Sequence, residues 1–320
     1  MPTHPAPREL TTTSHGATLA ADLTVPDRDT AVPGVVMVGG SGPSDRTNAD
    51  YFTAIRDHLV AAGIAVLSYD KRGVGASTGD WRASTIDDLA TDALAALAAL
   101  RADPGVHTDR VGLFGHSEGG WVVLRAAARD GKLPWVITNS GPGTTPAVQD
   151  RHALGAALAS AGTTRSADAD AEAALALYDR LVEAGRRGAN FAEATRLVDE
   201  AGRPPGFADY WAEIVDHGWE FLTRKHDHDP IPDVRRLRCP HLALFGGADP
   251  LVPVPASIAA FTAVACEPDR DCHAILRTVV FPGADHRVQL DGGKRLAPGY
   301  SRTLTEWITG ERATDQLSRS

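Results

Sequence analysis

The residues with the clearest chemical meaning form the pentapeptide Gly115-His116-Ser117-Glu118-Gly119. A Gly-x-Ser-x-Gly pattern between a strand and a helix is typical of a nucleophile elbow, a sharp turn that presents the serine hydroxyl above a sheet. Glycine suits the positions two residues before and after the serine, because a Cβ atom there would crowd the neighbouring chain. The apolar residues 111–114 precede the pattern, and a helix-favouring segment follows it. We therefore predict that Ser117 is a nucleophile.

A serine hydroxyl is a weak nucleophile unless a base accepts its proton and an acid orients the base. Around such an elbow the partners follow in the order serine, acid, histidine, each after a strand. Asp249 follows an apolar segment in a glycine-containing loop, and His286 follows the last apolar segment of the chain. Asp285 is adjacent to His286 but points elsewhere on an extended backbone. We therefore predict a catalytic triad of Ser117, Asp249 and His286.

Backbone N–H groups must stabilise the negative oxygen that forms when a serine attacks a carbonyl. Glu118 follows the nucleophile and is predicted to supply one N–H group, while its carboxylate is expected to form a structural hydrogen bond or salt bridge. The segment Gly39-Gly40-Ser41-Gly42-Pro43-Ser44-Asp45-Arg46 follows an apolar strand, and the N–H of Ser41 is the predicted second donor. No Gly-Lys-Ser/Thr sequence follows, so a phosphate-binding loop is not expected. Further substrate contacts are predicted at Gly40, Gly42 and His116.

Short apolar segments bounded by glycine or polar residues predict the buried strands that position these loops. They lie at residues 34–38, 64–69, 110–114, 135–138, 241–245 and 278–281. Helical patterns separate the first four, and two further short strands are expected between residues 8 and 25. This alternation predicts an α/β fold with a doubly wound, mostly parallel sheet.

The alternation stops after Gly143, where a long segment rich in Ala, Arg, Glu and Asp begins. Its helical periodicity predicts helices at residues 171–184, 191–201 and 207–222. We predict a core made of residues 1–143 and 236–320, with residues 144–235 inserted as a helical cap. Trp211 and Trp219 are eight residues apart, which suits either the lining of an acyl pocket or the core of the cap.

Composition excludes several classes of protein. The 320 residues are 43% hydrophobic, and their net charge of -9 without clustered Lys or Arg argues against nucleic-acid binding. No apolar run approaches a membrane span and no secretory signal is recognised, so a cytoplasmic protein is expected. His226-Asp227-His228-Asp229 is not predicted to bind a metal, because histidines at i and i+2 do not share a helix face. Cys266 and Cys272 flank a polar loop, and their pairing stays open, although cytosolic disulfides are uncommon.

Three motifs carry a resemblance to a known family. They are the segment of residues 39–46, Tyr69-Asp70-Lys71-Arg72-Gly73-Val74-Gly75-Ala76-Ser77, and residues 115–120. Together they resemble bacterial α/β-hydrolases related to carboxylesterases, dienelactone hydrolases and the acyl-CoA thioesterase/bile-acid acyltransferase group. The resemblance implies the α/β-hydrolase fold, with an eight-stranded sheet and a helical cap between strands six and seven. Gly39 stands where many lipases and esterases have histidine, which leaves the shape of the oxyanion loop open.

The motifs and the resemblance together predict a serine esterase that acts through an acyl-enzyme and needs no metal or cofactor. Its partner is expected to be a small-molecule ester or thioester. Thioester hydrolysis and acyl transfer use the same triad and stay open as alternatives. A non-catalytic ligand-binding protein on a hydrolase fold is the alternative of another class. The sequence identifies neither the acyl group nor the oligomeric state.

Overall fold

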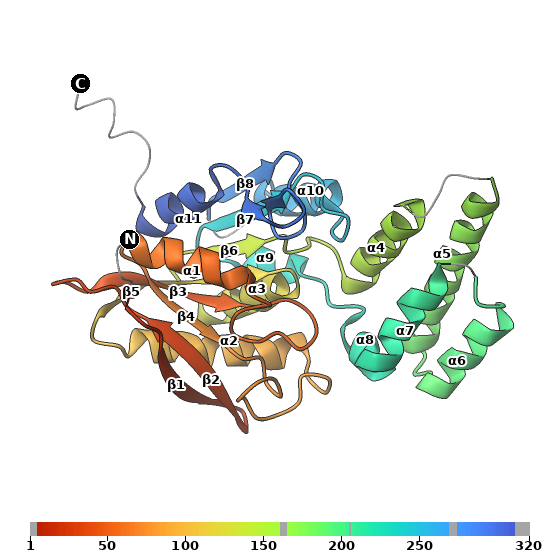
Figure 1. Ribbon diagram of the computed structural model, residues 1–320, viewed down its shortest axis with the longest axis horizontal. Coiled ribbons are helices and arrows are strands. Elements are labelled where there is room, and N and C mark those ends of the chain that lie inside the picture. The colour runs from red at the N-terminus through yellow and green to blue at the C-terminus, as the bar shows by residue number, and fades with distance from the viewer. Residues whose placement is uncertain (1–4, 161–164, 205, 269–273, 311–320) are drawn as a thin grey trace.

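Eight strands form one sheet in the computed structural model, which describes residues 5–160, 165–204, 206–268 and 274–310 (Figure 1). The strands are β1 (Arg8–Ser14), β2 (Ala17–Thr24), β3 (Val32–Val38), β4 (Ala65–Tyr69), β5 (Val106–His116), β6 (Val136–Asn139), β7 (His241–Gly246) and β8 (Leu276–Phe281). Their order across the sheet is β1-β2-β4-β3-β5-β6-β7-β8. β1 and β2 pair antiparallel, as do β2 and β4, whereas β3 to β8 run parallel. The predicted α/β class with an eight-stranded, mostly parallel sheet is confirmed.

Helices cover both faces of the sheet, because successive residues of a strand point to opposite sides. In β3, Met37 packs in a cluster with α1 (Tyr51–Ala61) and α11 (Tyr300–Thr309). Val36 packs on the other face with α2 (Ile86–Arg101), α3 (Glu118–Asp130) and α10 (Val254–Ala265). These two apolar layers fix the strands, so the loops at their carboxyl ends meet along one edge.

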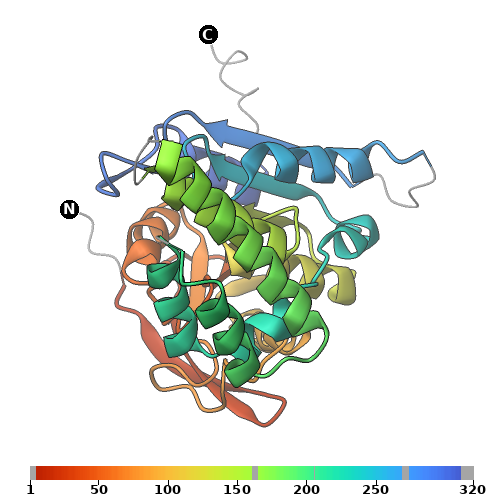
Figure 2. The ribbon, with the colours of Figure 1, turned by 90° about the vertical axis from the view of Figure 1, so that its right-hand side faces the viewer.

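Six helices of the described residues lie between β6 and β7, and we call the first five the cap. These five are α4 (Pro146–Ser160), α5 (Arg165–Arg186), α6 (Phe191–Glu200), α7 (Phe207–His217) and α8 (Trp219–Lys225). The cap stands to one side of the sheet in Figure 1 and in front of it in Figure 2. Its apolar residues form a cluster of their own, which includes Trp211 and Trp219. Both tryptophans therefore contribute to the core of the cap.

One predicted helix, over residues 207–222, is divided in the structure. α7 ends before Gly218 and α8 begins after it, because Gly218 has φ 89° and ψ 124°, a conformation that glycine tolerates and a helix excludes. Other elements that were not predicted are α4, α9 (Ile231–Arg236), α10 and the two strands of a small hairpin, β9 (Gln289–Leu290) and β10 (Arg295–Leu296).

A last helix of this region, α9 (Ile231–Arg236), packs on the core instead of on the cap. Its buried Asp233 accepts a hydrogen bond from Arg125 of α3 at 2.7 Å. Cys239 is buried and Cys266 is exposed, while Cys272, the other half of the open cysteine pair, lies outside the described residues. Within the described part of the chain, no helix has the length and apolar character needed to cross a membrane.

Candidate active site

Ser117 occupies a sharp turn between β5 and α3. Its backbone has φ 56° and ψ -121°, a conformation that a non-glycine residue rarely adopts and that is often found at functional sites. A Cβ atom on Gly115 would collide with the carbonyl of Gly119, and a Cβ atom on Gly119 would collide with the carbonyl of Val38. The two glycines therefore allow the tight packing that this turn requires.

Asp249 and His286 are in contact, although 37 residues separate them in the chain. The loop after β7 carries Asp249, and the loop after β8 carries His286. His286 Nδ1 lies 2.8 Å from Asp249 Oδ2, while Oδ1 of the same carboxylate accepts two backbone N–H groups of its own loop. Asp285, in contrast, accepts backbone N–H groups of Arg287 and Gln289. Since Nδ1 faces the carboxylate, Nε2 of His286 is the ring nitrogen that can face another partner.

The imidazole of His286 lies beside the elbow. Its ring centroid is 4.9 Å from that of His116, the residue directly before Ser117. Among the described residues, no hydrogen bond joins the Ser117 hydroxyl to His286. The hydrogen bond between Asp249 and His286 is thus present without the one between His286 and Ser117. Catalytic hydrogen bonds are often long without substrate and tighten when it binds.

The glycine-rich loop after β3 faces the serine. A Cβ atom on Gly40 would lie 3.4 Å from Ser117 Cβ and from His116 Nδ1, so the backbone of this loop lies against the elbow. Within the described residues, the N–H groups of Ser41 and Glu118 make no hydrogen bond. Two free donors thus flank the serine, as an oxyanion hole requires. Gly42 has φ +74° and open space around its Cα.

Asn48 is a residue of the site that no sequence motif singled out. Its amide Nδ2 donates to His116 Nδ1 at 3.1 Å, and its Oδ1 accepts from Ser44 Oγ at 2.9 Å and from the Gly40 N–H at 3.5 Å. His116 is buried between Tyr51 and His286. Burial, reinforced by His286, holds the pKa of His116 well below its usual value. His116 is therefore a neutral, buried support beneath the site.

The carboxylate of Glu118 lies buried between two lysines. Lys71, two residues after the end of β4, donates to Oε1 at 2.8 Å, and Lys225, at the end of α8, donates to Oε2 at 2.8 Å. Lys71 Nζ also donates to the carbonyl of Gly40. Burial alone would raise the pKa of Glu118, but Lys225 and Lys71 outweigh it and lower this pKa to about 2. The expected salt bridge of Glu118 is confirmed, and it reaches into the cap.

Burial also acts on two ionisable groups that the cap brings to this region. It lowers the pKa of Lys225 to about 8, against the opposing effect of Glu118. It raises the pKa of Asp150, in α4, to about 7, and the charge of Glu118 acts in the same direction. Burial therefore shifts the pKa values of Lys225 and Asp150 toward neutral pH.

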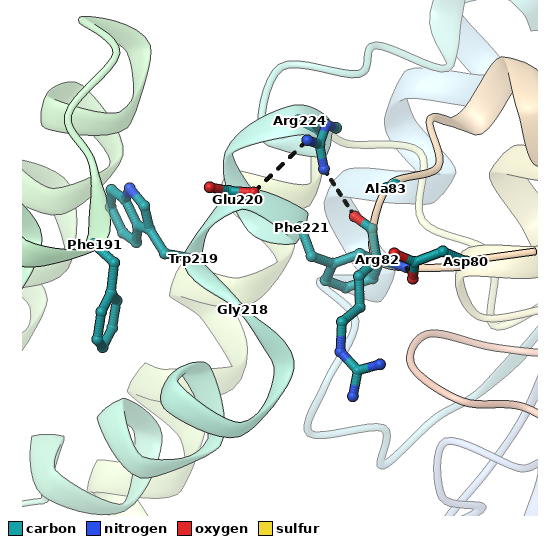
Figure 3. Close-up of a pocket in the computed structure, with 9 residues that line it drawn as sticks. All are labelled: Asp80, Arg82, Ala83, Phe191, Gly218, Trp219, Glu220, Phe221 and Arg224. Carbon is teal, nitrogen blue, oxygen red and sulfur yellow. Dashed lines mark hydrogen bonds and ion pairs between the residues drawn. The ribbon is translucent and has the colours of Figure 1, made fainter. Parts of the chain in front are cut away.

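A cavity of about 350 Å³ opens where the cap meets the core. Figure 3 shows Phe191 and Trp219 on one side of it and Phe221 and Arg82 on the other. The Phe221 ring lies 3.7 Å from Lys225 Nζ, which in turn contacts Glu118 of the elbow. Two side chains thus connect the wall of the cavity to the residue after Ser117.

No group of three or more histidine, cysteine, aspartate or glutamate residues in the described ranges could hold a metal ion. His226 is buried, and His228 forms an edge contact with Trp121. Burial lowers the pKa of each histidine to about 4. Both are thus neutral imidazoles near neutral pH.

An eight-stranded, mostly parallel sheet with a nucleophile elbow after β5 is the architecture of the α/β-hydrolase superfamily. The chain belongs to the X-Pro dipeptidyl-peptidase (S15) family, whose profile matches residues 15–283. It is therefore a hydrolase of the α/β-hydrolase superfamily, as the motifs predicted. The peptidase family itself was not among the groups that the motifs suggested.

Individual proteins resemble this chain either over less than half of its length or at low sequence identity. The chain is 34% identical over 134 residues to the quorum-quenching protein AidA of Acinetobacter baumannii (strain MDR-ZJ06), a match that covers 42% of this chain and 43% of that protein. Proline iminopeptidase of Mycobacterium smegmatis has a TM-score of 0.59 and 18% identity, covering 95% of this chain and 98% of that one. Dienelactone hydrolase of Anabaena variabilis has a TM-score of 0.55 and 17% identity, covering 96% and 99%. These structures share the fold.

Proposed function

We propose that this protein is a serine hydrolase that cleaves carboxylic esters of small to medium substrates through an acyl-enzyme. The observation that carries the proposal is His286, held by Asp249 at 2.8 Å and placed beside the elbow of Ser117. The free N–H groups of Ser41 and Glu118 support it, because a carbonyl attacked by Ser117 develops negative charge that needs donors.

In the proposed mechanism, Ser117 Oγ attacks the ester carbonyl while Nε2 of His286 accepts the hydroxyl proton. The tetrahedral oxyanion accepts hydrogen bonds from the N–H groups of Ser41 and Glu118, each worth roughly 3–4 kcal/mol in the transition state. The carbon–oxygen bond to the alcohol breaks, and His286 returns the proton to the leaving oxygen. Water, deprotonated by His286, then attacks the acyl-enzyme and releases the acid and free Ser117.

The ester assignment rests on the motifs shared with carboxylesterases and dienelactone hydrolases. Thioester hydrolysis and acyl transfer use the same steps with another leaving group or acceptor. Membership of the X-Pro dipeptidyl-peptidase family favours a second candidate, cleavage of a peptide bond that follows proline. That reaction needs the same triad, with His286 protonating an amine in place of an alcohol.

We propose that the cavity at the junction of cap and core receives the part of the substrate remote from the scissile bond. Its walls include Phe191, Trp219 and Phe221, so an aryl or alkyl group fits this lining better than a polar one. A volume of about 350 Å³ suits a group of small to medium size. The contact of Phe221 with Lys225 links this wall to the elbow.

The test combines labelling with a choice of substrates. A fluorophosphonate probe should label the wild-type protein on Ser117, and p-nitrophenyl butyrate should give a burst of p-nitrophenol equal to the enzyme concentration. Ser117→Ala should lose both signals while keeping its melting temperature. Glycyl-prolyl-p-nitroanilide should be cleaved far more slowly than the ester. Faster cleavage of the anilide would make the peptidase the correct candidate, and a folded wild type that resists the probe would indicate a non-catalytic protein.

A further inference from the structure

Three buried charged side chains lie beneath the predicted oxyanion donors and have no part in the triad. Lys71, Glu118 and Lys225 have side chains that are 7%, 3% and 4% exposed. Burying three charges is costly unless each has partners, and here both lysines bind the same carboxylate. Because burying these charges is unfavourable, we expect the cluster to have a specific role beside the elbow.

Lys71 contacts the peptide group that carries one predicted donor. The carbonyl of Gly40 and the N–H of Ser41 belong to the same planar trans peptide, in which they point in opposite directions. Because Lys71 Nζ donates to that carbonyl, the Ser41 N–H is directed away from Lys71. A cation bound to a carbonyl oxygen also polarises the peptide, which makes its N–H a stronger donor. The backbone of Lys71 is itself fixed, because its N–H donates to the Ser44 carbonyl at 3.0 Å.

Lys225 acts on the residue that carries the other predicted donor. It reaches the elbow from the last residue of α8 and binds Glu118 Oε2, while Lys71 binds Oε1 of the same carboxylate. Its ammonium also lies 3.7 Å from the centre of the Phe221 ring one helical turn earlier, which orients the side chain. The cap therefore restrains the side chain of the residue that offers the second N–H.

We propose that Lys71 and Lys225 are positioning residues of the oxyanion hole, and that the cap completes this hole by contributing Lys225. The proposal rests on the ester-hydrolase function proposed above. Two ammonium groups against one carboxylate also leave an excess positive charge under the position where the oxyanion forms. In a site shielded from water, such a charge favours the transition state over the neutral ester.

The test replaces each lysine by methionine, which keeps the length of the side chain and removes its charge. Lys71→Met and Lys225→Met should lower kcat roughly 10- to 100-fold, less than the 10²- to 10³-fold expected for loss of a whole donor. KM for p-nitrophenyl acetate should stay within about 3-fold, since the oxyanion exists only in the transition state. The inhibition constant of an aryl trifluoromethyl ketone, which forms an oxyanion on the serine, should rise in proportion to the loss of kcat/KM. Lys71→Arg should restore part of the rate, because a charge and donors return.

Lys132→Met is the matched control, because Lys132 is exposed just after α3. It should leave kcat and the inhibition constant unchanged. If both folded methionine variants keep kcat within about 3-fold of this control, or lose kcat without weaker ketone binding, the lysines are structural only and the proposal is wrong. Lys71 also holds the Gly40 carbonyl, so Lys71→Met removes one more contact than Lys225→Met does. If Lys71→Met does not fold, Lys225→Met decides the outcome. Failure of the proposed function gives a different result: the wild type then shows no ester burst and no probe on Ser117.

Discussion

Asp249 uses its two carboxylate oxygens differently. One accepts backbone N–H groups of Leu251 and Val252 at 2.8 Å and 3.1 Å, and the other binds His286 Nδ1 at 2.8 Å. The backbone bonds fix the carboxylate, and the carboxylate fixes the ring. A carboxylate can only accept, so it requires a proton on Nδ1 and leaves Nε2 as the acceptor that Ser117 needs.

Asp249→Asn tests this division of roles between the two oxygens. In Asp249→Asn the amide oxygen can keep the backbone bonds, but the NH2 group then faces Nδ1 and demands an acceptor there. The proton moves to Nε2, which can no longer accept from Ser117. We expect kcat for p-nitrophenyl butyrate to fall roughly 10³- to 10⁴-fold with little change in melting temperature.

Asp285→Asn is the control for this prediction. Asp285 directly precedes His286, yet its carboxylate accepts backbone N–H groups at 2.9 Å that an asparagine oxygen can also accept. Its kcat should remain near that of the wild type. A large loss in Asp285→Asn, with activity kept in Asp249→Asn, would mean that the acid of the triad has been assigned to the wrong residue.

The sequence allowed Ser117, Asp249 and His286 to be proposed because each follows a recognisable apolar strand, and a parallel sheet brings such loops to one edge. Lys225 and Asn48 have no such marker. The bond between Lys225 and Glu118 joins residues 107 positions apart and depends on how the cap docks. Lysines are common on exposed helix faces, so nothing in the local sequence distinguishes one that is buried.

Among the elements, the parallel strands were predictable because they contain continuous apolar runs between glycines and polar loops, whereas β1 and β2 were predicted from the alternation of their residues. α4 was missed because its apolar residues are spread around the helix axis and give no period of 3.6. The division of α7 from α8 was missed although Gly218 marks it, since isolated glycines are tolerated in helices. That break has a consequence: α8 takes its own direction and carries both Phe221 of the cavity wall and Lys225.

A variant of Phe191, at the start of α6, tests whether the cavity binds substrate. Phe191 begins α6, is 39% exposed and stacks on Trp211 with ring centroids 5.6 Å apart. Phe191→Ala should therefore fold and should enlarge the opening. We expect KM for a p-nitrophenyl phenylacetate ester to rise about 5- to 12-fold, the effect of losing some 40–60 Å² of apolar contact. KM for p-nitrophenyl acetate, which does not fill the cavity, should not change.

Val148→Ala serves as the comparison for this measurement. Val148 is another exposed apolar residue of the cap, at 49%, and it does not line the cavity. It should leave both KM values unchanged. Equal KM values for the two esters in Phe191→Ala and the wild type would show that the substrate binds elsewhere.

At the scale of the whole molecule, α8 joins the cap to the core through three kinds of contact. Arg224 donates to the carbonyl of Arg82 at 2.9 Å, the Phe221 ring packs edge-on against Trp81, and Lys225 binds Glu118. The last contact is buried, whereas Arg224 is exposed. A buried ion pair loses far more than an exposed one when a partner is removed, so Glu118 should matter most for the stability of the cap on the core.

That expectation can be tested through pH. The pKa of Glu118 is lowered from its ordinary value of 4.5 to about 2 in the folded protein, so the ionised form is the one that folding favours. Its contribution to the free energy of unfolding is complete above pH 5 and is lost as the pH falls toward 2. The shift corresponds to roughly 3 kcal/mol at neutral pH. Glu118→Gln cannot titrate and should lack this dependence.

Urea unfolding of the wild type and Glu118→Gln should therefore differ by roughly 3 kcal/mol at pH 7 and by less than about half of that at pH 3. Glu183→Gln is the matched control, because Glu183 of α5 forms an exposed pair at 3.1 Å with Arg187, the residue that follows this helix. It should cost less than about 1 kcal/mol at either pH. A difference for Glu118→Gln that stays constant from pH 7 to pH 3 would mean that its carboxylate is not held ionised by Lys71 and Lys225. The cap would then be attached to the core by its apolar contacts rather than by this ion cluster.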